Sequence, residues 1–436
     1  MIWLRRAFTL PLILLFIVLI IAAVTVTAVN NTAANSDFYN DLMVREDVYN
    51  YVYDDILPAA LDEMDTSDMS DLPVDIGDLH VEIAAAAEQA FPPSWLQVQF
   101  ESITDVLIPY IVDNEPGFSY TFMVQDRMDE LAQAIKDNLL TGDALLSIYD
   151  GVVSYMAEYY YQQLPALLQV MGVTQSHIEA ALREVMTPEW LRDHLVDDVD
   201  EVVAYLSGDR NYFEVDIPVQ ELVIDQALLE LLGSGGEDYL DEAWAWLDGG
   251  WTYTQNDLYS DLDEESIQNL QDVRGWIRDG YTFDQDDLKD AMSDDSEGSQ
   301  SFDDARYWIG VGRSLIWVLW LVPFLLLVGI GFLGGRGWKT RAAGPLVVLF
   351  VVSLAMFLGV MLTWGQWGET AMHDAITTSG QQGVEAAAMA KADAVAVDAT
   401  GSLVGNMQNI YMYMLIASGV GLAAVGVWWL ISSRGK

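Results

Sequence analysis

The 436-residue sequence contains no cysteine, so no disulfide holds any part of it together. Its four histidines, His80, His177, His194 and His373, lack the close ligand spacing of a zinc site. It also lacks a Gly-x-Ser-x-Gly elbow and a glycine-rich phosphate loop, because Gly329, Gly331 and Gly334 lie at the inner end of an apolar stretch, where glycine permits close packing or a helix end. These absences remove the common catalytic signatures, and we expect no enzymatic activity.

Charged residues are absent from four apolar stretches of 20 to 22 residues, at 8–29, 314–333, 345–364 and 411–431. A helix rises about 1.5 Å per residue, so about 20 residues cross a hydrocarbon core about 30 Å thick. The stretches therefore predict four transmembrane helices. None contains Asp, Glu, Lys, Arg or His, which disfavours ion-coupled transport because that chemistry needs ionisable groups inside the membrane.

Basic residues are scarce, 19 against 66 acidic ones, and seven of them flank the apolar stretches in segments without any acidic residue. Lysine and arginine near span ends are retained on the cytoplasmic side. This rule predicts a multi-pass protein of the plasma membrane with both termini cytoplasmic and a large domain outside. The seven residues are Arg5, Arg6, Arg336, Lys339, Arg341, Arg434 and Lys436.

The first apolar stretch has a second interpretation as a cleavable signal peptide, because Val26, Thr27 and Ala28 offer a cleavage site near its end. We favour a retained helix, since the stretch exceeds the roughly 7 to 15 apolar residues of a signal core. Cleavage would leave three spans and would change only the side on which the N-terminus lies.

All 66 acidic residues fall on the predicted outer side. Segment 30–310 holds 61 of them with only ten basic residues, a formal charge of −51. Such a field repels phosphate, which excludes nucleic acid and anionic lipid as partners of this segment. We expect membrane lipid around the spans and an unknown extracellular or periplasmic partner, and a homo-oligomer stays open. The alternative is that the charge only keeps a surface domain soluble.

The charge pattern also divides the chain into parts. These are the N-terminus with the first span (1–29), the acidic outer domain (30–292), a polar linker (293–304) and the last three spans (305–436) with a cytoplasmic loop (334–344) and an outer loop (365–410). In the outer loop, alanine-rich 384–400 predicts a short helix beside the outer domain. The outer domain divides further into modules at about 37–139 and 143–232 and half-modules at about 236–263 and 264–292.

The two modules are related by an offset of 95 residues. The recurring pairs are Pro93 and Pro188, Trp95 and Trp190, Leu96 and Leu191, Tyr110 and Tyr205, Phe118 and Phe213, and Gln125 and Gln220. Proline before each tryptophan predicts a helix start, and the alternation that follows a turn predicts strands at 118–122 and 213–217. Upstream, Tyr53 matches Tyr160 at an offset of 107, so an inserted loop is predicted within 63–78.

The half-modules are related by an offset of 30 residues, which aligns 246–258 with 276–288. Each contains one predicted strand, and we expect the four strands to form a single small sheet, because an isolated strand leaves its backbone groups unsatisfied. A solenoid in which each module contacts only its neighbours is the alternative. The predicted fold is an α+β outer domain, mostly helical with tandem helix-turn-strand-helix repeats and a small sheet, on a four-helix transmembrane bundle.

Calcium is the one cofactor that the sequence leaves open. The run 293–298 is similar to an EF-hand loop with Gly298 in sixth place, but serine stands where the first aspartate is needed. Weakly bound Ca²⁺ is a second hypothesis, although charge runs are commonly only solvated. Its candidate ligands are Asp261, Asp263, Glu264, Asp284, Asp286 and Asp287.

Small residues recur four positions apart in the last two spans and predict close helix contacts. They serve packing within one bundle or between subunits, and the first is favoured. The residues are Ala355, Gly359, Ala417, Gly419, Gly421 and Ala423.

The Pro-x-Trp-Leu helix that precedes a turn and an alternating strand resembles repeats in uncharacterised bacterial multi-pass cell-envelope proteins. The resemblance covers roughly 53–288 and implies no known activity. The topology alone is similar to large-pore channel subunits, whose outer cysteines this sequence lacks. We expect the chain to present its acidic outer domain for ligand or partner binding or for cell-surface assembly, and a subunit of an oligomeric passive channel is the alternative.

Overall fold

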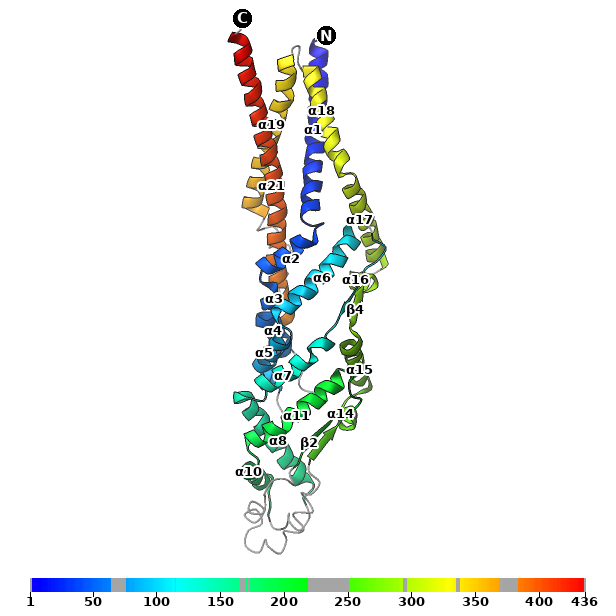
Figure 1. Ribbon diagram of the computed structural model, residues 1–436, viewed down its shortest axis with the longest axis vertical. Helices are drawn as coiled ribbons and strands as arrows, with labels where there is room; N and C mark the ends of the chain where they lie inside the picture. Colours follow the sequence, from blue (N-terminus) through cyan, green and yellow to red (C-terminus); the bar gives the residue numbers. More distant parts are fainter. Residues whose placement is uncertain are drawn as a thin grey trace. The chain divides into compact units, whose positions relative to one another are not determined.

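The computed structural model describes residues 2–63, 76–113, 115–164, 170, 172–218, 251–292, 296–334, 338–368, 370 and 383–434. The described chain is mostly helical with four short strands, which confirms the predicted secondary-structure class (Figure 1). It divides into two compact units. The first unit holds Met1–Val48, Gln97–Tyr120 and Phe283–Lys436, and the second holds Tyr49–Leu96 and Thr121–Thr282.

The first unit contains the apolar helices together with part of the acidic segment. Its elements are α1 (Ile2–Asn31), α2 (Ser36–Arg45), most of α6 (Pro93–Val112), α16 (Gln285–Met292), α17 (Ser296–Ser314), α18 (Ile316–Gly334), α19 (Trp338–Thr363), the π-helix η7 (Trp364–Gly368) and α21 (Gly383–Arg434).

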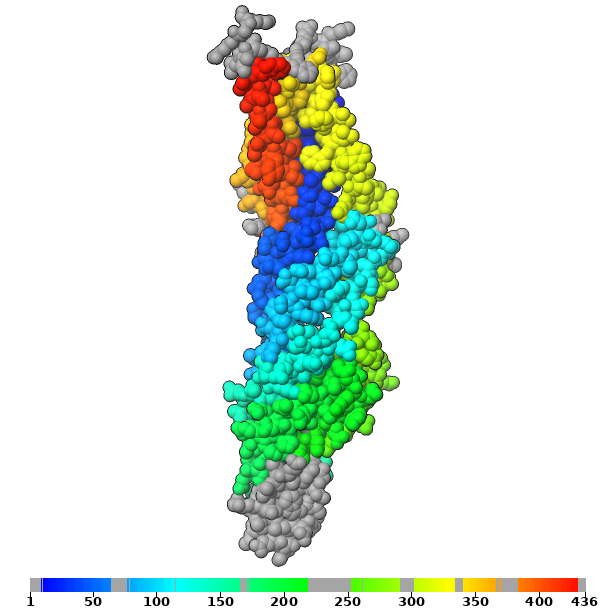
Figure 2. Space-filling view, viewed as in Figure 1, coloured from blue at the N-terminus to red at the C-terminus, as the bar shows by residue number. Residues whose placement is uncertain are grey.

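Four helices of this unit are long and apolar enough to cross a membrane, at Pro11–Asn31, Ile316–Leu333, Thr340–Thr363 and Gly383–Trp429. Phe16 and Ile20 of α1 pack with Ile330 of α18 and Val352 of α19 in their core. A polar contact supplements this packing, because the Trp320 indole N–H donates to the Thr27 hydroxyl at 2.8 Å. Figure 2 shows the blue atoms of α1 between the yellow atoms of α18 and the orange and red atoms of α21.

The last of these helices is much longer than a span, which corrects the prediction of a separate short helix at 384–400. The alanine-rich stretch continues into the fourth apolar stretch as one helix of 52 residues, α21. At about 1.5 Å per residue it extends about 78 Å, more than twice a hydrocarbon core. Arg45 of α2 contacts its polar half through Asp398 at 2.9 Å and Ser402 at 3.3 Å.

The predicted polar linker 293–304 is also different, since α17 begins at Ser296 and continues to Ser314. Gly298 is therefore inside a helix and not in a loop of the EF-hand type. Only 293–295 of this run lie outside the described residues.

The second unit consists of helices and short strands from two chain segments. Its elements are α3 (Val48–Tyr51), η1 (Val52–Ile56), α4 (Leu57–Glu63), η3 (Ile76–Leu79), α5 (His80–Ala90), η4 (Gln125–Arg127), α7 (Met128–Asn138), α8 (Gly142–Gln162), α10 (Gln175–Val185), α11 (Pro188–Leu206), β2 (Glu214–Ile217), β3 (Trp251–Thr254), α14 (Gln255–Asp261) and α15 (Glu264–Asp279). The boundary between the units falls within α3, α6, β1 (Ser119–Phe122) and β4 (Tyr281–Asp284).

Proline starts both helices for which it was predicted, α6 at Pro93 and α11 at Pro188. The Thr187 hydroxyl caps α11 by accepting from the Trp190 N–H at 3.1 Å. Trp95 and Trp190 are partly buried, and Trp190 packs against a core formed by α8, α10 and α11. The core residues include Val153, Met156, Met186 and Leu191, all fully buried.

The strands pair differently from the prediction of one sheet. β1 pairs with β4 in one two-stranded sheet, and β2 pairs with β3 in another. β2 and β3 are antiparallel, with Val215 opposite Tyr253. Each strand of a long module thus takes its partner from a half-module. The half-modules supply the returning strands, and the expected four-stranded sheet is wrong for the described residues.

Two tyrosine hydroxyls make similar contacts in the second unit. The Tyr53 hydroxyl donates to the Phe91 carbonyl, and the Tyr149 hydroxyl donates to the Met186 carbonyl at 2.8 Å. Phe91 and Met186 are 95 residues apart, and the two tyrosines are 96 apart. The contact of Tyr149 is thus similar to that of Tyr53, while the pairing of Tyr53 with Tyr160 stays a prediction. The predicted insertion within 63–78 falls mostly on 64–75, which lie outside the described residues.

Candidate functional site

The candidate calcium ligands lie at two helix starts, one in each unit. Asp261 ends α14, and Asp263 is the N-cap of α15, where its carboxylate accepts from the Ser266 N–H at 2.7 Å. This bond lowers the pKa of Asp263. Glu264 follows in the first turn and is exposed. A carboxylate at an N-cap satisfies free backbone N–H groups and interacts favourably with the helix dipole.

The second group begins α16. The Asp284 carboxylate accepts from the N–H groups of Asp286 at 2.8 Å and Asp287 at 3.3 Å, while the Asp287 carboxylate accepts from the Asp284 N–H at 2.9 Å. The pair forms a reciprocal cap. Among the residues that the structure describes, no group of three or more His, Asp or Glu is placed to hold a metal ion. Weak Ca²⁺ binding stays a prediction.

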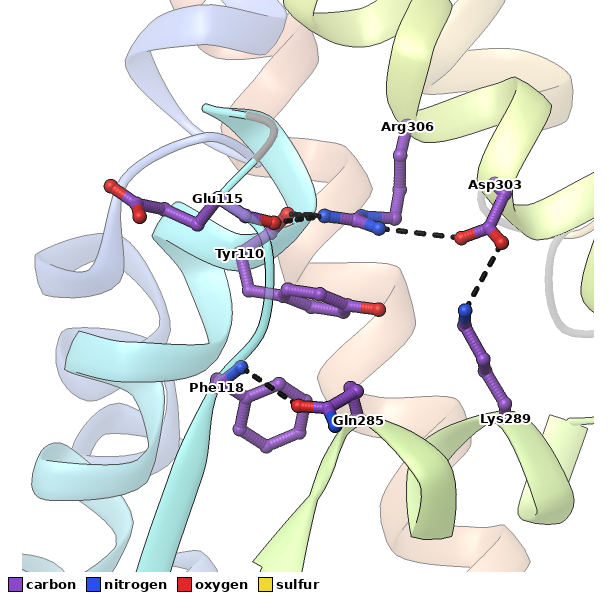
Figure 3. A network of polar contacts seen from close by, with 7 residues as sticks. All are labelled: Tyr110, Glu115, Phe118, Gln285, Lys289, Asp303 and Arg306. Atoms are coloured by element: carbon purple, nitrogen blue, oxygen red, sulfur yellow. Dashed lines mark hydrogen bonds and ion pairs between the residues drawn. The ribbon is translucent and has the colours of Figure 1, made fainter.

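A polar network in the first unit is centred on Arg306 of α17 (Figure 3). Its guanidinium donates to the Tyr110 carbonyl at 2.7 and 3.0 Å and to the Glu115 carbonyl at 2.7 Å. It also lies 3.6 Å from the centroid of the Tyr110 ring. Arg306 therefore caps the last turn of α6, whose carbonyls have no partner within the helix, and adds a cation–π contact.

Carboxylate and amide groups extend this network. Asp303 accepts from Arg306 at 3.3 Å and from Lys289 at 3.0 Å, and the Lys289 bond is the largest cause of the lowered pKa of Asp303. The Gln285 side chain accepts from the Phe118 N–H at 3.2 Å. The residues come from α6, from segment 115–118 before β1, and from α16 and α17, so the network joins chain segments about 170 to 200 residues apart.

A matching network surrounds Arg274 of α15 in the second unit. Arg274 donates to the Tyr205 carbonyl at 2.8 Å and to the Arg210 carbonyl at 3.1 Å, and its guanidinium lies 3.7 Å from the Tyr205 ring centroid. Tyr205 packs on Phe213 at 5.1 Å between ring centroids, as Tyr110 packs on Phe118 at 5.0 Å. Both arginines cap the end of the helix that begins with the Pro-x-Trp-Leu motif.

Sequence reasoning missed these arginines. Arg274 and Arg306 are 32 residues apart, whereas the half-modules align at 30, because the two helices that carry them begin at different distances after the strands. The one indication in the sequence is that basic residues are scarce, since segment 30–310 has only ten of them. A lone arginine among acidic residues has many exposed ion-pair partners, so its burial against one tyrosine is decided by the tertiary fold.

All ten basic residues of segment 30–310 contact groups of the chain itself. Nine form ion pairs, and Arg274 donates to the two carbonyls described above. The pairs are Arg45–Asp398, Arg127–Glu130, Lys136–Asp200, Arg183–Asp150, Arg192–Asp193, Arg210–Glu201, Arg278–Asp279, Lys289–Asp303 and Arg306–Asp303. The cations of the segment are therefore already engaged, and most of its carboxylates have no cation of their own.

One carboxylate, that of Asp198, shows the effect of the excess of acidic over basic residues. Asp198 of α11 has a pKa raised to about 7, chiefly by burial and further by the charges of Glu201 and Asp216. Its Oδ2 is buried and makes no hydrogen bond within the described chain. The neighbouring His194 acts in the opposite direction, though less strongly. Asp198 is therefore the described carboxylate with the largest upward pKa shift.

In the spans, two of the predicted small residues contact another helix. A Cβ at Gly421 would lie 3.0 Å from a methyl group of Leu346 on α19, and a Cβ at Gly419 would lie 3.6 Å from the Phe350 ring. Gly359 has no atom within 4 Å of the position of a Cβ, and Ala355, Ala417 and Ala423 are exposed. The hydroxyl-bearing residues Ser353 and Ser418 are buried, so they do not line an open path in this chain.

Comparison of the chain with protein-family models, with curated proteins and with solved structures gives no match. The resemblance to cell-envelope repeats stays a prediction. The features that bear on function are thus four apolar helices and an acidic segment whose few cations already have partners.

Proposed function

We propose that this chain is a four-pass protein of the plasma membrane that presents its acidic segment outside the cytoplasm to a cationic partner. The single observation that carries the proposal is that all ten basic residues of segment 30–310 already contact the chain itself. Within the segment no cation is left to neutralise its formal charge of −51 further, and from outside it Arg313 pairs with Asp113 at 2.6 Å. The remaining counter-charge must come from ions or from a positively charged partner.

Charge also decides between kinds of partner. Two copies of the same acidic segment repel each other, so direct assembly through this surface alone is disfavoured. A basic protein or peptide is attracted at long range and binds faster at low ionic strength. Simple cations would screen the charge without a fixed geometry. We therefore favour a basic macromolecule over self-assembly.

The orientation that this function needs is supported by the ends of the apolar helices. In Figure 1 the start of α1, the end of α18, the start of α19 and the end of α21 lie at one end of the group. Five of the flanking basic residues, Arg5, Arg6, Lys339, Arg341 and Arg434, belong to these ends, which under the positive-inside rule face the cytoplasm. The acidic segment would then lie outside.

The matched arginine networks support a second part of the proposal, that the outer segment is a duplicated module. Each copy contains a proline-started helix, a short strand, a partner strand from a half-module and an arginine that caps the first helix. The two caps have nearly the same ring distances, 3.6 and 3.7 Å. Duplication would extend the acidic surface without a new kind of core.

The test uses the full-length protein in lipid nanodiscs and a lysine-rich peptide as the probe. We expect binding that weakens steeply between about 0.05 and 0.2 M salt, as attraction between many charges does. A glutamate-rich peptide of equal length is the control. The matched variant replaces three exposed carboxylates that belong to none of the ion pairs described above, Asp129, Asp143 and Asp197, with asparagine, and it should bind the lysine-rich peptide more weakly. Equal binding of both peptides, or binding that is insensitive to salt, would contradict the proposal.

A further inference from the structure

An apolar cavity of about 380 Å³ lies between α18 and α19. Phe324, Leu327 and Val328 line it from α18, and Pro345, Leu346 and Leu349 line it from α19. Its size falls at the lower end of the range of roughly 300 to 1,000 Å³ for ligand sites. Both helices are candidate spans, so hydrocarbon and not water is the medium expected around this cavity.

The cavity opens to the surroundings of the bundle. Phe324 and Phe332 on its rim are 62% and 58% exposed, which in a membrane means that they face lipid. The helices meet closely at one point, because a Cβ on Gly331 would lie 2.6 Å from the Arg341 carbonyl and 2.8 Å from the Pro345 ring. Gly331 therefore closes one wall while the phenylalanine rim leaves the other accessible to a lipid chain.

Arg341 is the single charged residue that lines this cavity. It lies in the first turn of α19, and its guanidinium is 5.6 Å from the centroid of the Phe332 ring. Arginine forms two parallel hydrogen bonds with phosphate, and the N-terminal turn of a helix favours an anion. A cation at the end of an apolar cavity is complementary to a molecule with a hydrocarbon chain and an anionic head.

We infer that this cavity binds one anionic phospholipid of the membrane, with an acyl chain between α18 and α19 and the phosphate at Arg341. Basic pockets between transmembrane helices recognise anionic headgroups in this way. The site lies apart from the acidic segment, which repels such lipids, and the inference does not depend on the cationic partner proposed above.

The experiment measures binding of two lipids to the full-length protein in detergent by native mass spectrometry. Phosphatidylglycerol and phosphatidylcholine with identical acyl chains differ in net headgroup charge. We expect phosphatidylglycerol to bind on the order of tenfold more tightly, because both lipids carry a phosphate but the choline cation of phosphatidylcholine offsets its charge beside Arg341. Lipid extracted from the purified protein should likewise be enriched in anionic species.

Two variants separate the charge from the cavity. Arg341→Ala should remove the preference by weakening phosphatidylglycerol more than phosphatidylcholine, whereas Ala342→Phe, on the cavity wall, should weaken both lipids by filling the space for the chain. Arg434→Ala removes a charge from the end of α21 and is the matched control, with no effect expected. Equal affinity of the wild type for the two lipids, or an unchanged preference in Arg341→Ala, would overturn the inference. If Arg341→Ala does not fold, Arg341→Lys and the extracted-lipid measurement decide it.

Discussion

At the scale of single residues, the stability of the acidic segment depends on how its few cations are used. Arg306 is only 7% exposed and Lys289 shares its carboxylate partner Asp303. Burial of a guanidinium is unfavourable unless its donors are satisfied, and here carbonyls, a carboxylate and an aromatic face supply the partners. These side chains therefore make specific contacts that stabilise the fold, and they are not simply solvated surface charges.

Replacing either arginine tests this account. Arg306→Ala and Arg274→Ala should each lower the free energy of unfolding by about 2 to 4 kcal/mol, because a helix end loses its cap and a cation–π contact. Thermal unfolding of the full-length protein measures the effect. Arg192→Ala is the control, since its exposed pair with Asp193 should contribute no more than about 1 kcal/mol. Equal effects of all three would contradict it.

Asp198 predicts a dependence of stability on pH. Its folded pKa of about 7 is above the ordinary value of 3.8, so the folded state binds the proton more tightly. Stability should fall as pH rises from about 4 to 7 and then level off. Asp198→Asn should abolish this pH dependence and raise the free energy of unfolding at pH 8 by about 1 to 2 kcal/mol. The gain is smaller than the one expected at a fully buried carboxylate, because Asp198 is partly solvated. Melting curves from pH 5 to 8 provide the measurement, and an unchanged slope in the variant would refute it.

At the scale of elements, the pairing of β1 with β4 depends on the close approach of Gly280 to β1. Gly280 has φ +83°, and a Cβ there would lie 2.5 Å from the Thr121 methyl and 2.9 Å from the Phe122 carbonyl. Gly280→Ala should destabilise the β1–β4 pair by about 2 to 4 kcal/mol through strain and steric overlap.

The matched control is Gly172, which has the same φ of +83° but no atom within 4 Å of the position of a Cβ. Gly172→Ala should therefore include only the backbone strain, about 1 kcal/mol. The two variants are compared by thermal unfolding. If they destabilise equally, the close approach of Gly280 to β1 contributes nothing.

Local signals predicted these elements, but their partners were not predictable in the same way. Proline starts at Pro93 and Pro188 and the strands after Phe118 and Phe213 follow from adjacent residues. The pairing of β1 with β4 joins residues about 160 positions apart, and no local pattern encodes it. The interpretation of 293–304 as a linker rested on composition alone, whereas Arg306 docks this helix on α6 through contacts that only the fold supplies.

For the candidate site, the sequence predicted the acidic character but not the roles of individual residues. The excess of acid was visible in the sequence, but the carboxylates proposed as calcium ligands are divided between the two units, and Asp263, Asp284 and Asp287 cap helices. Aspartate serves either role, and its neighbours in the sequence do not distinguish them. The arginine caps became visible only when Tyr110 and Tyr205 were seen with their partners.

At the scale of the whole molecule, an uncompensated charge of −51 in segment 30–310 opposes folding by self-repulsion. Raising NaCl from about 0.01 M to about 1 M shortens the Debye length from about 30 Å to about 3 Å, so the unfolding temperature of the full-length protein should rise by several degrees. Sorbitol at equal osmolality is the control. An equal rise with sorbitol, or none with NaCl, would contradict this view, and an increase at micromolar Ca²⁺ would reveal a specific site.

The side of the membrane on which the acidic segment lies is the central claim, and the absence of cysteine allows a direct measurement. Single-cysteine variants at Val81, which is 77% exposed on α5, and at Thr340, at the start of α19, are labelled with a membrane-impermeant maleimide. In intact cells we expect labelling of Val81→Cys only, and labelling of Thr340→Cys after the membrane is permeabilised. Labelling of Thr340→Cys in intact cells with Val81→Cys protected would contradict the account.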